Sequence, residues 1–409
     1  MRFFYLDPGI DTSSGHHANW CRGIVREIRD RGIETRVLAF AGIEPALQAD
    51  LEAEPFFRAH THCKPDDDPI SGWLNSFDAV FRVTIEDLSR LDDVGPDDAF
   101  LWSSGEAAQL KAMLRWLHGL APERRPRVVF DLGQDPGMDI DARPEGTLYQ
   151  TRDPRHDPTA ILYRFTAGDL AGIDLDRFRL VTMGGAASTA YGILLKTPVG
   201  PLPMAQPESR PPVSRAGRRP ITVACLGHQR PEKGFHLLPE ICRRLLIAHP
   251  EVRILIHNGV PHEQPVPHGE LKRMAAEDNR IEVRHGPTDQ AGWAALLDAA
   301  DLMLCPYSPE RYRLRSSGIC IESIAAGIPL VVPSGTYLER EMREFGAAGA
   351  SFDQPELATI VRAIGLVLAN FDDLATTCHA AATRARQTHG IKPFVDALLP
   401  LLGLAERTA

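Results

Sequence analysis

The chain has 409 residues, enough for two or three domains whose cores need no disulfides or metals for stability. Hydrophobic residues make up 44%, charged residues 24% and aromatic residues 7%, which excludes a long disordered or low-complexity protein. With 45 Lys and Arg against 54 Asp and Glu, the formal net charge is −9. This excludes an overall basic field that would hold a nucleic-acid backbone, so we expect no nucleic-acid partner.

The cysteines and the start of the chain bear on where the protein works. The seven cysteines are odd in number and widely spaced, and no two form a Cys-x-x-Cys pair, a pattern typical of a reducing compartment. The apolar run at the start ends at Asp7 and Pro8, so it is too short for an export signal. No apolar run approaches the ~18 residues that a membrane span needs. We therefore expect a cytoplasmic protein, with peripheral contact at the inner face of a membrane left open.

The first half of the chain alternates short apolar runs with segments of helical periodicity. Residues 2–6 are typical of a strand, and Trp20, Ile24 and Ile28 recur at helical spacing soon after. Further strands are predicted at residues 35–40, 77–83, 99–102, 127–131 and 178–182. Strands separated by helices of about ten or more residues indicate a parallel, doubly wound α/β sheet.

A change of composition divides the chain. Residues 206–218 are rich in proline and arginine and lack periodicity, which indicates a solvated linker. The alternation then restarts, with strands predicted at residues 221–226, 252–256, 281–284, 302–305 and 329–332. We expect Rossmann-like domains at 1–205 and 219–388, and a helical tail at 389–409 that packs back on the first domain. Such sheets bind ligands outside the carboxyl ends of their strands, so the site should lie in a central cleft.

The most specific motif is the segment CLGHQRPEKGFHLLPEI at residues 225–241. An apolar strand ends near Gly227 and a helix starts near Gly234, with Arg230 and Lys233 between them. A glycine-containing turn, two cations and a helix N-terminus together are typical of a diphosphate site. The alternative is a solvated basic loop.

A second segment, residues 300–336, complements the first. A strand leads through a polar loop to Ser316, Ser317 and Gly318, where a helix is predicted to begin. The free backbone N–H groups of that helix would face the same phosphates. Glu322, about one turn into the helix, would accept hydrogen bonds from both hydroxyls of a ribose. The alternative is that Ser317 is only an N-cap and Glu322 an exposed helix residue.

These two segments carry a resemblance to a known family. The residues that carry it are Gly227, Lys233, Gly234, Ala300, Asp301, Pro306, Glu322, Gly327, Pro329, Val331 and Val332. In this pattern residues 219–350 resemble the donor-binding domain of the GT-B glycosyltransferases of family 4. The resemblance implies two Rossmann-like domains facing a central cleft, with the donor in the second, the acceptor in the first, and retention at the anomeric carbon. It also implies that no metal and no cofactor are needed, with a nucleoside diphosphate-sugar as substrate.

Two positions depart from the family's pattern. The arginine that the family places directly after the turn glycine is His228 here, so Arg230 is the candidate for that phosphate contact. The family's other glutamate, eight residues before the ribose-binding one, is replaced by Leu314. Glu310 is the nearest acid upstream, at a different spacing. The identity of the donor sugar therefore cannot be carried over from the family.

In the first domain, the turn after the first strand contains Gly15, His16 and His17. Gly15 permits close approach of a ligand to the backbone, and the helix start favours an anion such as a donor phosphate. Either histidine would then hydrogen-bond an acceptor or a phosphate; the alternative is a pair that only caps or packs. Asp131 ends a buried strand, where polar side chains enter ligand sites, and is a candidate for the acceptor site unless it only terminates a turn.

Other chemistry-bearing residues carry less weight. His60, His62 and Cys63 resemble a metal triad, but no fourth ligand is in register, so we expect no metal site. Asp66 and Asp68 do not follow an apolar strand, which indicates a solvated turn. The chain contains no Walker phosphate loop and no Gly-x-Ser-x-Gly elbow.

The sequence therefore predicts a retaining glycosyltransferase that moves a sugar from a nucleotide-sugar to an acceptor hydroxyl in glycan or glycoconjugate biosynthesis. The candidates are Arg230, Lys233, His16 and His17 for catalysis; Gly15, Gly227, Arg230, Lys233, Ser316, Ser317, Gly318 and Glu322 for donor binding; and Asp131 for the acceptor. The acceptor is a glycan, a lipid-linked molecule, a protein or a small molecule. Two alternatives stay open: a transferase-like subunit that binds without turnover, which Leu314 favours, and a sugar-nucleotide epimerase of the same fold.

Overall fold

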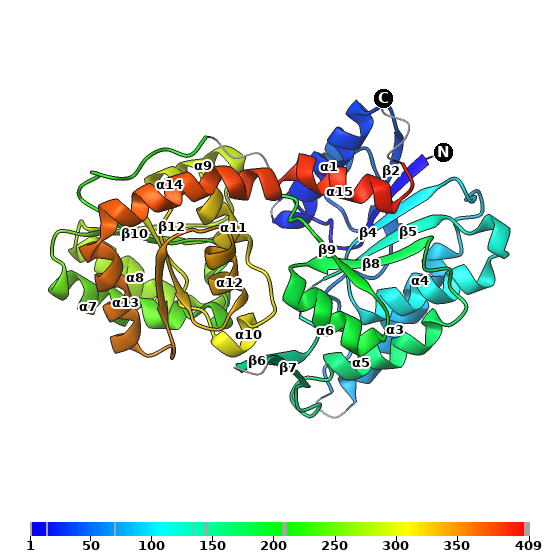
Figure 1. The fold of residues 1–409 in the computed structure, drawn as a ribbon, viewed down its shortest axis with the longest axis horizontal. Coiled ribbons are helices and arrows are strands. Elements are labelled where there is room, and N and C mark those ends of the chain that lie inside the picture. The colour runs from blue at the N-terminus through cyan, green and yellow to red at the C-terminus, as the bar shows by residue number, and fades with distance from the viewer. Residues whose placement is uncertain are drawn as a thin grey trace. The chain divides into compact units, whose positions relative to one another are not determined.

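The computed structural model describes residues 2–13, 15–68, 71–133, 135–143, 146–206 and 211–404. The chain divides into two compact units, and many of their elements are labelled in Figure 1. The first unit holds residues 2–206 and 390–404, and the second unit holds residues 211–389. Residues 207–210 of the expected linker and 405–409 of the expected tail lie outside the described residues.

Within the described part of the first unit, strands form one sheet in the order β3-β2-β1-β4-β5-β8-β9. The strands are β1 (Arg2–Asp7), β2 (Glu34–Phe40), β3 (Ala53–Phe57), β4 (Ala99–Gly105), β5 (Arg127–Leu132), β8 (Phe178–Met183) and β9 (Val199–Leu202). Every adjacent pair is parallel, and β4 is buried along its whole length. The chain winds outward from β1 in both directions, which confirms the predicted doubly wound sheet.

The helices of the first unit include one from the far end of the chain. They are α1 (His16–Asp30), α2 (Pro45–Leu51), α3 (Gly72–Leu88), α4 (Ala107–Gly119), α5 (Thr159–Thr166), α6 (Gly185–Leu195) and α15 (Ile391–Leu401). The last of these, red in Figure 1, packs along α1, because a Cβ at Gly23 would lie 2.5 Å from Cδ1 of Ile391. Arg31 also donates to Asp396 at 2.7 Å.

The strand predicted at residues 77–83 is wrong. This segment lies inside α3, whose buried side chains include Phe77, Val80, Thr84 and Leu88. These positions recur every three or four residues, which is the period of a helix, and a short apolar run does not distinguish that period from a strand. The edge strand on this side of the sheet is β3, which the sequence patterns did not predict.

An antiparallel hairpin is inserted between β5 and α5, and it too was absent from the sequence prediction. It consists of β6 (Met138–Arg143) and β7 (Gly146–Thr151). Arg152 fixes its base through ion pairs with Asp135, Asp139 and Asp157 at 2.7, 3.0 and 2.9 Å. An isolated two-stranded hairpin is marginally stable, so these ion pairs help to hold it on the first unit.

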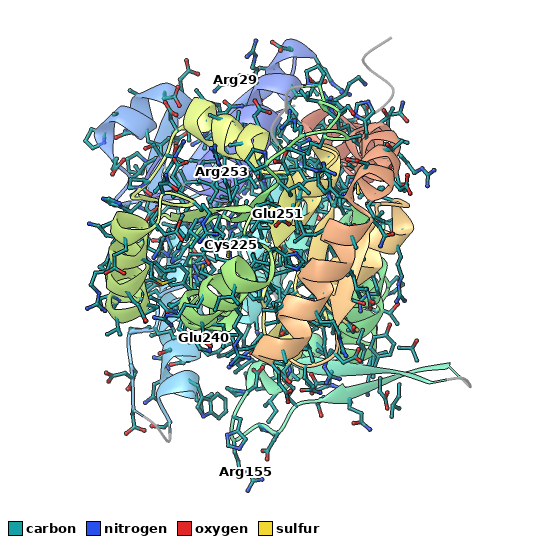
Figure 2. All side chains as sticks on the ribbon, turned by 90° about the vertical axis from the view of Figure 1, so that its left-hand side faces the viewer. Arg29, Arg155, Cys225, Glu240, Glu251 and Arg253 are labelled. Carbon is teal, nitrogen blue, oxygen red and sulfur yellow. The ribbon has the colours of Figure 1, made fainter. Side chains whose placement is uncertain are left out.

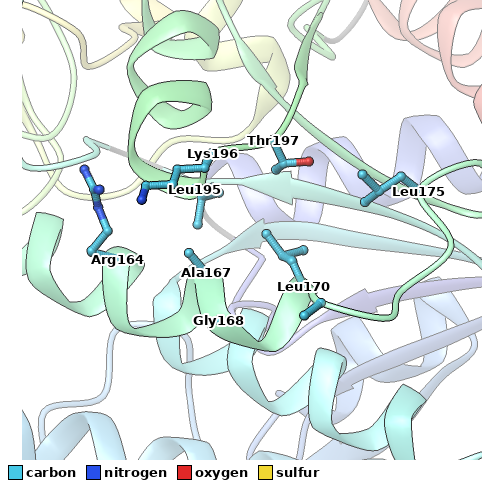
Figure 3. A pocket seen from close by; sticks show the side chains of 9 residues that line it. Arg164, Ala167, Gly168, Leu170, Leu175, Leu195, Lys196 and Thr197 are labelled. Atoms are coloured by element: carbon cyan, nitrogen blue, oxygen red, sulfur yellow. The ribbon is translucent and has the colours of Figure 1, made fainter.

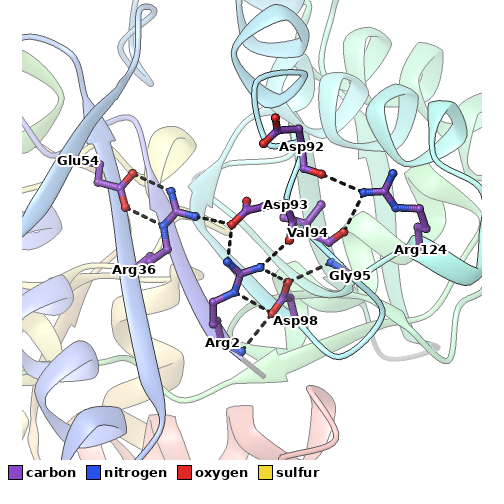
Figure 4. A network of polar contacts seen from close by, with 9 residues as sticks. All are labelled: Arg2, Arg36, Glu54, Asp92, Asp93, Val94, Gly95, Asp98 and Arg124. Carbon is purple, nitrogen blue, oxygen red and sulfur yellow. Dashed lines mark hydrogen bonds and ion pairs between the residues drawn. The ribbon is translucent and has the colours of Figure 1, made fainter.

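At the amino ends of its strands, the first sheet carries an ion-pair network (Figure 4). Arg2 of β1 donates to Asp98 at 2.7 Å, and Arg36 of β2 donates to Glu54 of β3 at 2.7 Å. Asp93 contacts both arginines. Ligands of such sheets bind at the carboxyl ends, so we interpret this network as structural.

The second unit contains a second parallel sheet, in the order β12-β11-β10-β13-β14-β15. Its strands are β10 (Thr222–Cys225), β11 (Arg253–Asn258), β12 (Ile281–His285), β13 (Leu302–Leu304), β14 (Leu330–Pro333) and β15 (Gly349–Phe352). Cys225 lies among closely packed side chains in Figure 2 and belongs to the apolar core of this unit. The prediction of a second doubly wound sheet is confirmed.

The helices of the second unit are α7 (Leu238–Ala248), α8 (Pro265–Glu277), α9 (Gln290–Ala299), α10 (Pro309–Tyr312), α11 (Gly318–Ala325), α12 (Tyr337–Glu344), α13 (Leu357–Ala369) and α14 (Phe371–Thr388).

A buried arginine caps two of these helices, α9 and α11. Arg215, although in the segment expected to be a solvated linker, is 1% exposed and donates to the carbonyl oxygens of Ala300 and Ala326. These carbonyls follow α9 and α11, where helices leave backbone acceptors unpaired.

Candidate functional site

The turn after β10 is shaped around Gly227. Its φ is +111°, and a Cβ there would lie 2.6 Å from Cδ1 of Ile319 in α11. A side chain is therefore excluded both by the backbone conformation and by the neighbouring helix. The two motifs that the sequence predicts separately, the glycine turn and the helix after Ser317, lie against each other.

Arg230 and Lys233 follow this turn. The next residue, Gly234, packs so closely on the Pro306 carbonyl that a Cβ would lie 2.0 Å from its oxygen. Lys233 Nζ lies 5.5 Å from the centre of the Tyr307 ring. Within the described ranges, no carboxylate forms an ion pair with either cation, and the charges that act most on Lys233 include Arg230.

The electrostatics of Lys233 favour an anionic ligand. Burial, together with repulsion from Arg230 and Arg315, lowers the pKa of its ammonium to about 8. An anion bound between these cations would relieve the repulsion and raise the pKa again. The loop is therefore not the fully solvated basic loop of the alternative interpretation.

The helix α11 begins directly after Ser316 and Ser317. Ser317 is its N-cap, and the Cys320 N–H donates to the Ser317 hydroxyl at 3.4 Å. Backbone N–H groups of a first turn have no intrahelical acceptor, so those of Gly318 and Ile319 are placed to meet a ligand. The capping role of Ser317 is thus real, and it is compatible with an anion site at the same helix end.

Glu322 lies one turn into α11 and is half-buried. It accepts a hydrogen bond from the indole Nε1 of Trp293 in α9. Burial raises the pKa of its carboxyl group to about 7, while the bond from Trp293 and the charge of Lys233 act in the opposite direction. The alternative of an exposed helix glutamate therefore does not describe this residue.

The second unit thus brings its predicted site residues together. Gly227 touches the start of α11, and Lys233 acts electrostatically with both Arg230 and Glu322. Two cations and free N–H groups suit the oxygens of a diphosphate. A carboxylate beside them suits the hydroxyls of the ribose that carries the diphosphate.

The two departures from the family pattern have distinct surroundings. His228 Nε2 lies 2.9 Å from Glu263 Oε1, and burial lowers the pKa of His228. It is therefore a weaker phosphate ligand than the arginine that it replaces. Leu314 is 1% exposed, so its position lies in the core. Glu310 is exposed and accepts a hydrogen bond from Ser308 at 2.7 Å.

In the first unit, the carboxyl end of β1 holds a histidine–aspartate pair. His17 Nδ1 lies 2.9 Å from each carboxylate oxygen of Asp7, which is fully buried. Burial lowers the pKa of His17, but the charge of Asp7 and its hydrogen bond outweigh this effect, so the net shift is upward. The sequence identified His17, but not the aspartate that orients it.

Gly15 and His16 flank this pair. Gly15 has a φ of +94°, and nothing lies within 4 Å of the position that its Cβ would take. The backbone conformation therefore requires glycine there, and the space beside it is open. The His16 ring lies 4.1 Å from the His17 ring and 4.9 Å from the Trp20 ring, measured between centres.

Asp131 is a buried acid with an unused acceptor. It is 3% exposed; its Oδ2 accepts from the Ser104 N–H at 3.4 Å, and its Oδ1 has no hydrogen-bond partner in the described part of the chain. Burial, together with the charge of Asp7, raises the pKa of Asp131 to about 7, although the hydrogen bond from the Ser104 N–H acts in the opposite direction. These surroundings favour a ligand-facing role over the termination of a turn.

Two further histidines join this end of the first sheet. The His62 ring lies 5.9 Å from the His17 ring, and His62 Nδ1 lies 3.1 Å from Glu106 Oε1. His60 Nε2 lies 3.7 Å from Asp11 Oδ2. Among the described residues, no group of three or more potential ligands is arranged to hold a metal ion. Both histidines follow β3, which is adjacent to β2, so they lie near the carboxyl end of β1. This is the signal that the sequence analysis missed.

A pocket of about 430 Å³ lies elsewhere in the first unit (Figure 3). Its lining includes Leu170, Leu175, Leu195, Arg164 and Lys196. These residues precede β8 and β9, so the pocket lies at the amino ends of the strands, and none of the predicted site residues lines it.

Comparison with known proteins identifies the fold. No protein-family model and no curated protein matches the sequence. The structure is similar to that of HepE from Anabaena in complex with UDP-glucose, with a TM-score of 0.62 and 16% identity over 98% of this chain and 99% of that one. It is also similar to sucrose-phosphate synthase from Thermosynechococcus elongatus, with a TM-score of 0.62 and 13% identity over 99% and 97%.

A glycosyltransferase from Rickettsia africae is similar to the same degree, with a TM-score of 0.62 and 11% identity over 98% of this chain and 97% of that one. At such identities the likeness establishes the fold, and the predicted GT-B fold is confirmed. Membership of family 4 stays a prediction. In the described part of the chain, no helix is long and apolar enough to cross a membrane.

Proposed function

We propose that the protein is a glycosyltransferase that moves a sugar from a nucleoside diphosphate-sugar to an acceptor hydroxyl. The observation that carries this proposal is the pair Arg230 and Lys233, which lack acidic ion-pair partners among the described residues, with Lys233 acting electrostatically on Glu322. The cations would bind the diphosphate, and Glu322 would accept from the ribose hydroxyls. The fold, and the UDP-glucose bound by HepE, support the same class of donor.

The proposed chemistry is electrostatic. As the bond between the anomeric carbon and the diphosphate oxygen breaks, negative charge grows on the diphosphate. Arg230, Lys233 and the N–H groups at the start of α11 stabilise that charge, and we propose that they do so without a metal. We further propose transfer with retention, in which a donor phosphate oxygen takes the proton of the acceptor hydroxyl. This scheme requires no side-chain nucleophile.

The acceptor side is assigned to the first unit. His16, His17 and Asp131 offer hydrogen-bonding groups at the carboxyl edge of its sheet, which is where such sheets bind ligands. A glycan, a lipid-linked molecule, a protein or a small molecule would each meet these groups through a hydroxyl. A role in glycan or glycoconjugate biosynthesis, a cytoplasmic location and contact with the inner face of a membrane remain predictions.

One observation favours a second candidate, a transferase-like subunit that binds a nucleotide without turnover. Leu314 is 1% exposed and apolar, at a position where family 4 commonly has an acid that contacts the donor sugar. A core leucine cannot hydrogen-bond a sugar hydroxyl. If no other residue supplies this contact, the donor would bind through its nucleotide alone.

Donor turnover tests both candidates and the epimerase alternative. UDP-, GDP- and ADP-sugars are incubated with the wild-type protein, with and without a panel of hydroxyl acceptors, and free nucleotide, free sugar and product are measured. Nucleotide release with sugar transfer or hydrolysis supports the transferase. Nucleotide binding without release supports the silent subunit, and an epimerised sugar-nucleotide supports the epimerase. Absence of binding by every nucleotide overturns the proposed site.

A further inference from the structure

Trp293 links two helices at the nucleotide side of the second unit. It lies in α9, and its indole N–H donates to Oε2 of Glu322 in α11. It is the one tryptophan in the sequence of residues 211–389, since the other four are at positions 20, 73, 102 and 116. The donor half of the protein therefore has a single indole, and it is bonded to the carboxylate assigned to the ribose.

The indole is held in place by its neighbours. Its Cη2 lies 3.9 Å from the position that a Cβ at Gly227 would take, so the ring reaches the turn after β10. Its centre lies 6.0 Å from that of the His257 ring, which approaches edge-on. His257 is fixed in turn by a 3.0 Å contact between its Nε2 and the Gly286 carbonyl oxygen. With the ring fixed, the direction of its N–H is fixed as well.

This hydrogen bond sets both the orientation and the charge of Glu322. An indole is a donor only, and an ionised carboxylate has about four acceptor positions, so one N–H leaves enough for two hydroxyls. A donor bonded to a carboxylate also favours its ionised form, and here that bond opposes the burial that raises the pKa of Glu322 to about 7. Lys233 is the charged group that acts on the same carboxylate.

We propose that Trp293 is a positioning residue for nucleotide recognition: by holding Glu322 oriented and ionised, it determines how strongly the site prefers a ribose with both hydroxyls over a deoxygenated sugar. This inference rests on the proposed function, because it takes Glu322 as the ribose ligand. It predicts a contribution to specificity from a residue that does not itself touch the hydroxyls.

The test compares ribose and dideoxyribose ligands. ADP, GDP and UDP are titrated calorimetrically into the wild-type protein, and the tightest binder is paired with its 2′,3′-dideoxy form. The ratio of the two dissociation constants is then measured for Trp293→Phe and for Trp293→3-benzothienylalanine, which keeps the indole's shape but lacks its N–H. We expect the ratio to fall by about tenfold or more, as for loss of one hydrogen bond to a charged group. The dideoxy ligand should bind with unchanged affinity, which also shows that the site is intact.

Three further measurements separate the outcomes. In Glu322→Gln the ratio should already be low, and adding Trp293→Phe should lower it no further, because the two residues act as one unit. The control Trp73→Phe, which alters an exposed tryptophan of the first unit, should leave the ratio unchanged. An unchanged ratio in both Trp293 variants, or equal weakening of both ligands, overturns the role of Trp293. Failure of the wild-type protein to bind any of the three nucleotides overturns the proposed function itself.

Discussion

The His17 ring occupies the space that a side chain at Gly9 would need, because a Cβ there would lie 2.5 Å from Cε1 of the ring. The Nδ1 atom of the same ring is bonded to the buried Asp7 carboxylate. Close contact with a glycine and a bond to an acid thus hold the imidazole in one orientation. A histidine that only caps a helix would need neither contact, so we interpret the arrangement as a functional one.

Removing the acid should reverse the pKa shift of His17. In Asp7→Asn, burial would act without the opposing charge, so the pKa of His17 should fall from above 6.5 to below it. NMR titration of the His17 ring protons measures this directly. Because the folded-state pKa is raised, the wild-type pair stabilises the fold fully below pH 6.5 and loses that contribution as the pH rises through the raised value. An unchanged pKa in Asp7→Asn would contradict the pairing.

Lys233→Ala should separate function from stability. Loss of one charge-assisted contact to the departing diphosphate should cost about 2 to 4 kcal/mol of transition-state stabilisation. This corresponds to a kcat/KM for the donor that is lower by roughly 30- to 1,000-fold. The melting temperature should stay the same or rise, because the native state lowers the pKa of this lysine and so disfavours its charge. The matched control is Lys272→Ala, which removes an exposed lysine from α8. Wild-type turnover by Lys233→Ala would remove the basis for the phosphate site.

The parts of the site that could be predicted from sequence are those encoded locally. Gly227, Arg230 and Lys233 lie within one loop, where a glycine and two cations are recognisable from residue type and spacing alone. Their contact with α11 could be expected only through the resemblance, since it depends on how β10 and β13 pair in the sheet. The alternation of strands and helices is likewise a local property, and it predicted both sheets.

The parts that could not be predicted depend on packing between distant segments. Trp293 is 29 residues from Glu322, and its indole reaches the carboxylate only because α9 and α11 meet in the folded unit. Asp7 was visible as a polar residue after a strand, but its burial and its bond to His17 were not. The position of Leu314 was known without its environment, and the structure places it in the core.

Leu314→Glu should therefore destabilise the second unit as well as change sugar recognition. Leu314 is 1% exposed, and a carboxyl group buried without a partner typically costs about 3 kcal/mol or more and has a raised pKa. Chemical denaturation should show a lower midpoint, with the largest loss at high pH, where the new carboxyl is ionised. Leu314→Met keeps the volume and polarity and is the control. If Leu314→Glu is as stable as wild type, the new side chain has reached solvent or a polar partner.

Transfer activity should survive chelation of divalent metals. The proposed mechanism supplies the positive field for the departing diphosphate from Arg230, Lys233 and a helix N-terminus, so a metal has no required role. Donor turnover is measured after dialysis against a chelator, and then with added Mg²⁺ or Mn²⁺. Complete loss that either ion restores would contradict the metal-independent mechanism and would redirect attention to the acids of the first unit.

The pH dependence of kcat/KM for the donor should be bell-shaped and narrow. Ribose binding requires ionised Glu322, whose pKa is raised to about 7, so activity should rise with pH through that value. Diphosphate stabilisation requires protonated Lys233, whose pKa is lowered to about 8, so activity should fall above it. Since kcat/KM reports the free enzyme, the profile of kcat should extend further to alkaline pH, where the bound diphosphate raises the pKa of Lys233.

Two variants test which residue causes each limb of the profile. Glu322→Gln should remove the acid limb, and Lys233→Arg should remove the alkaline limb, because a guanidinium does not titrate in this range. An alkaline limb that persists unchanged in Lys233→Arg would assign it to another group and leave the lysine's role to charge alone.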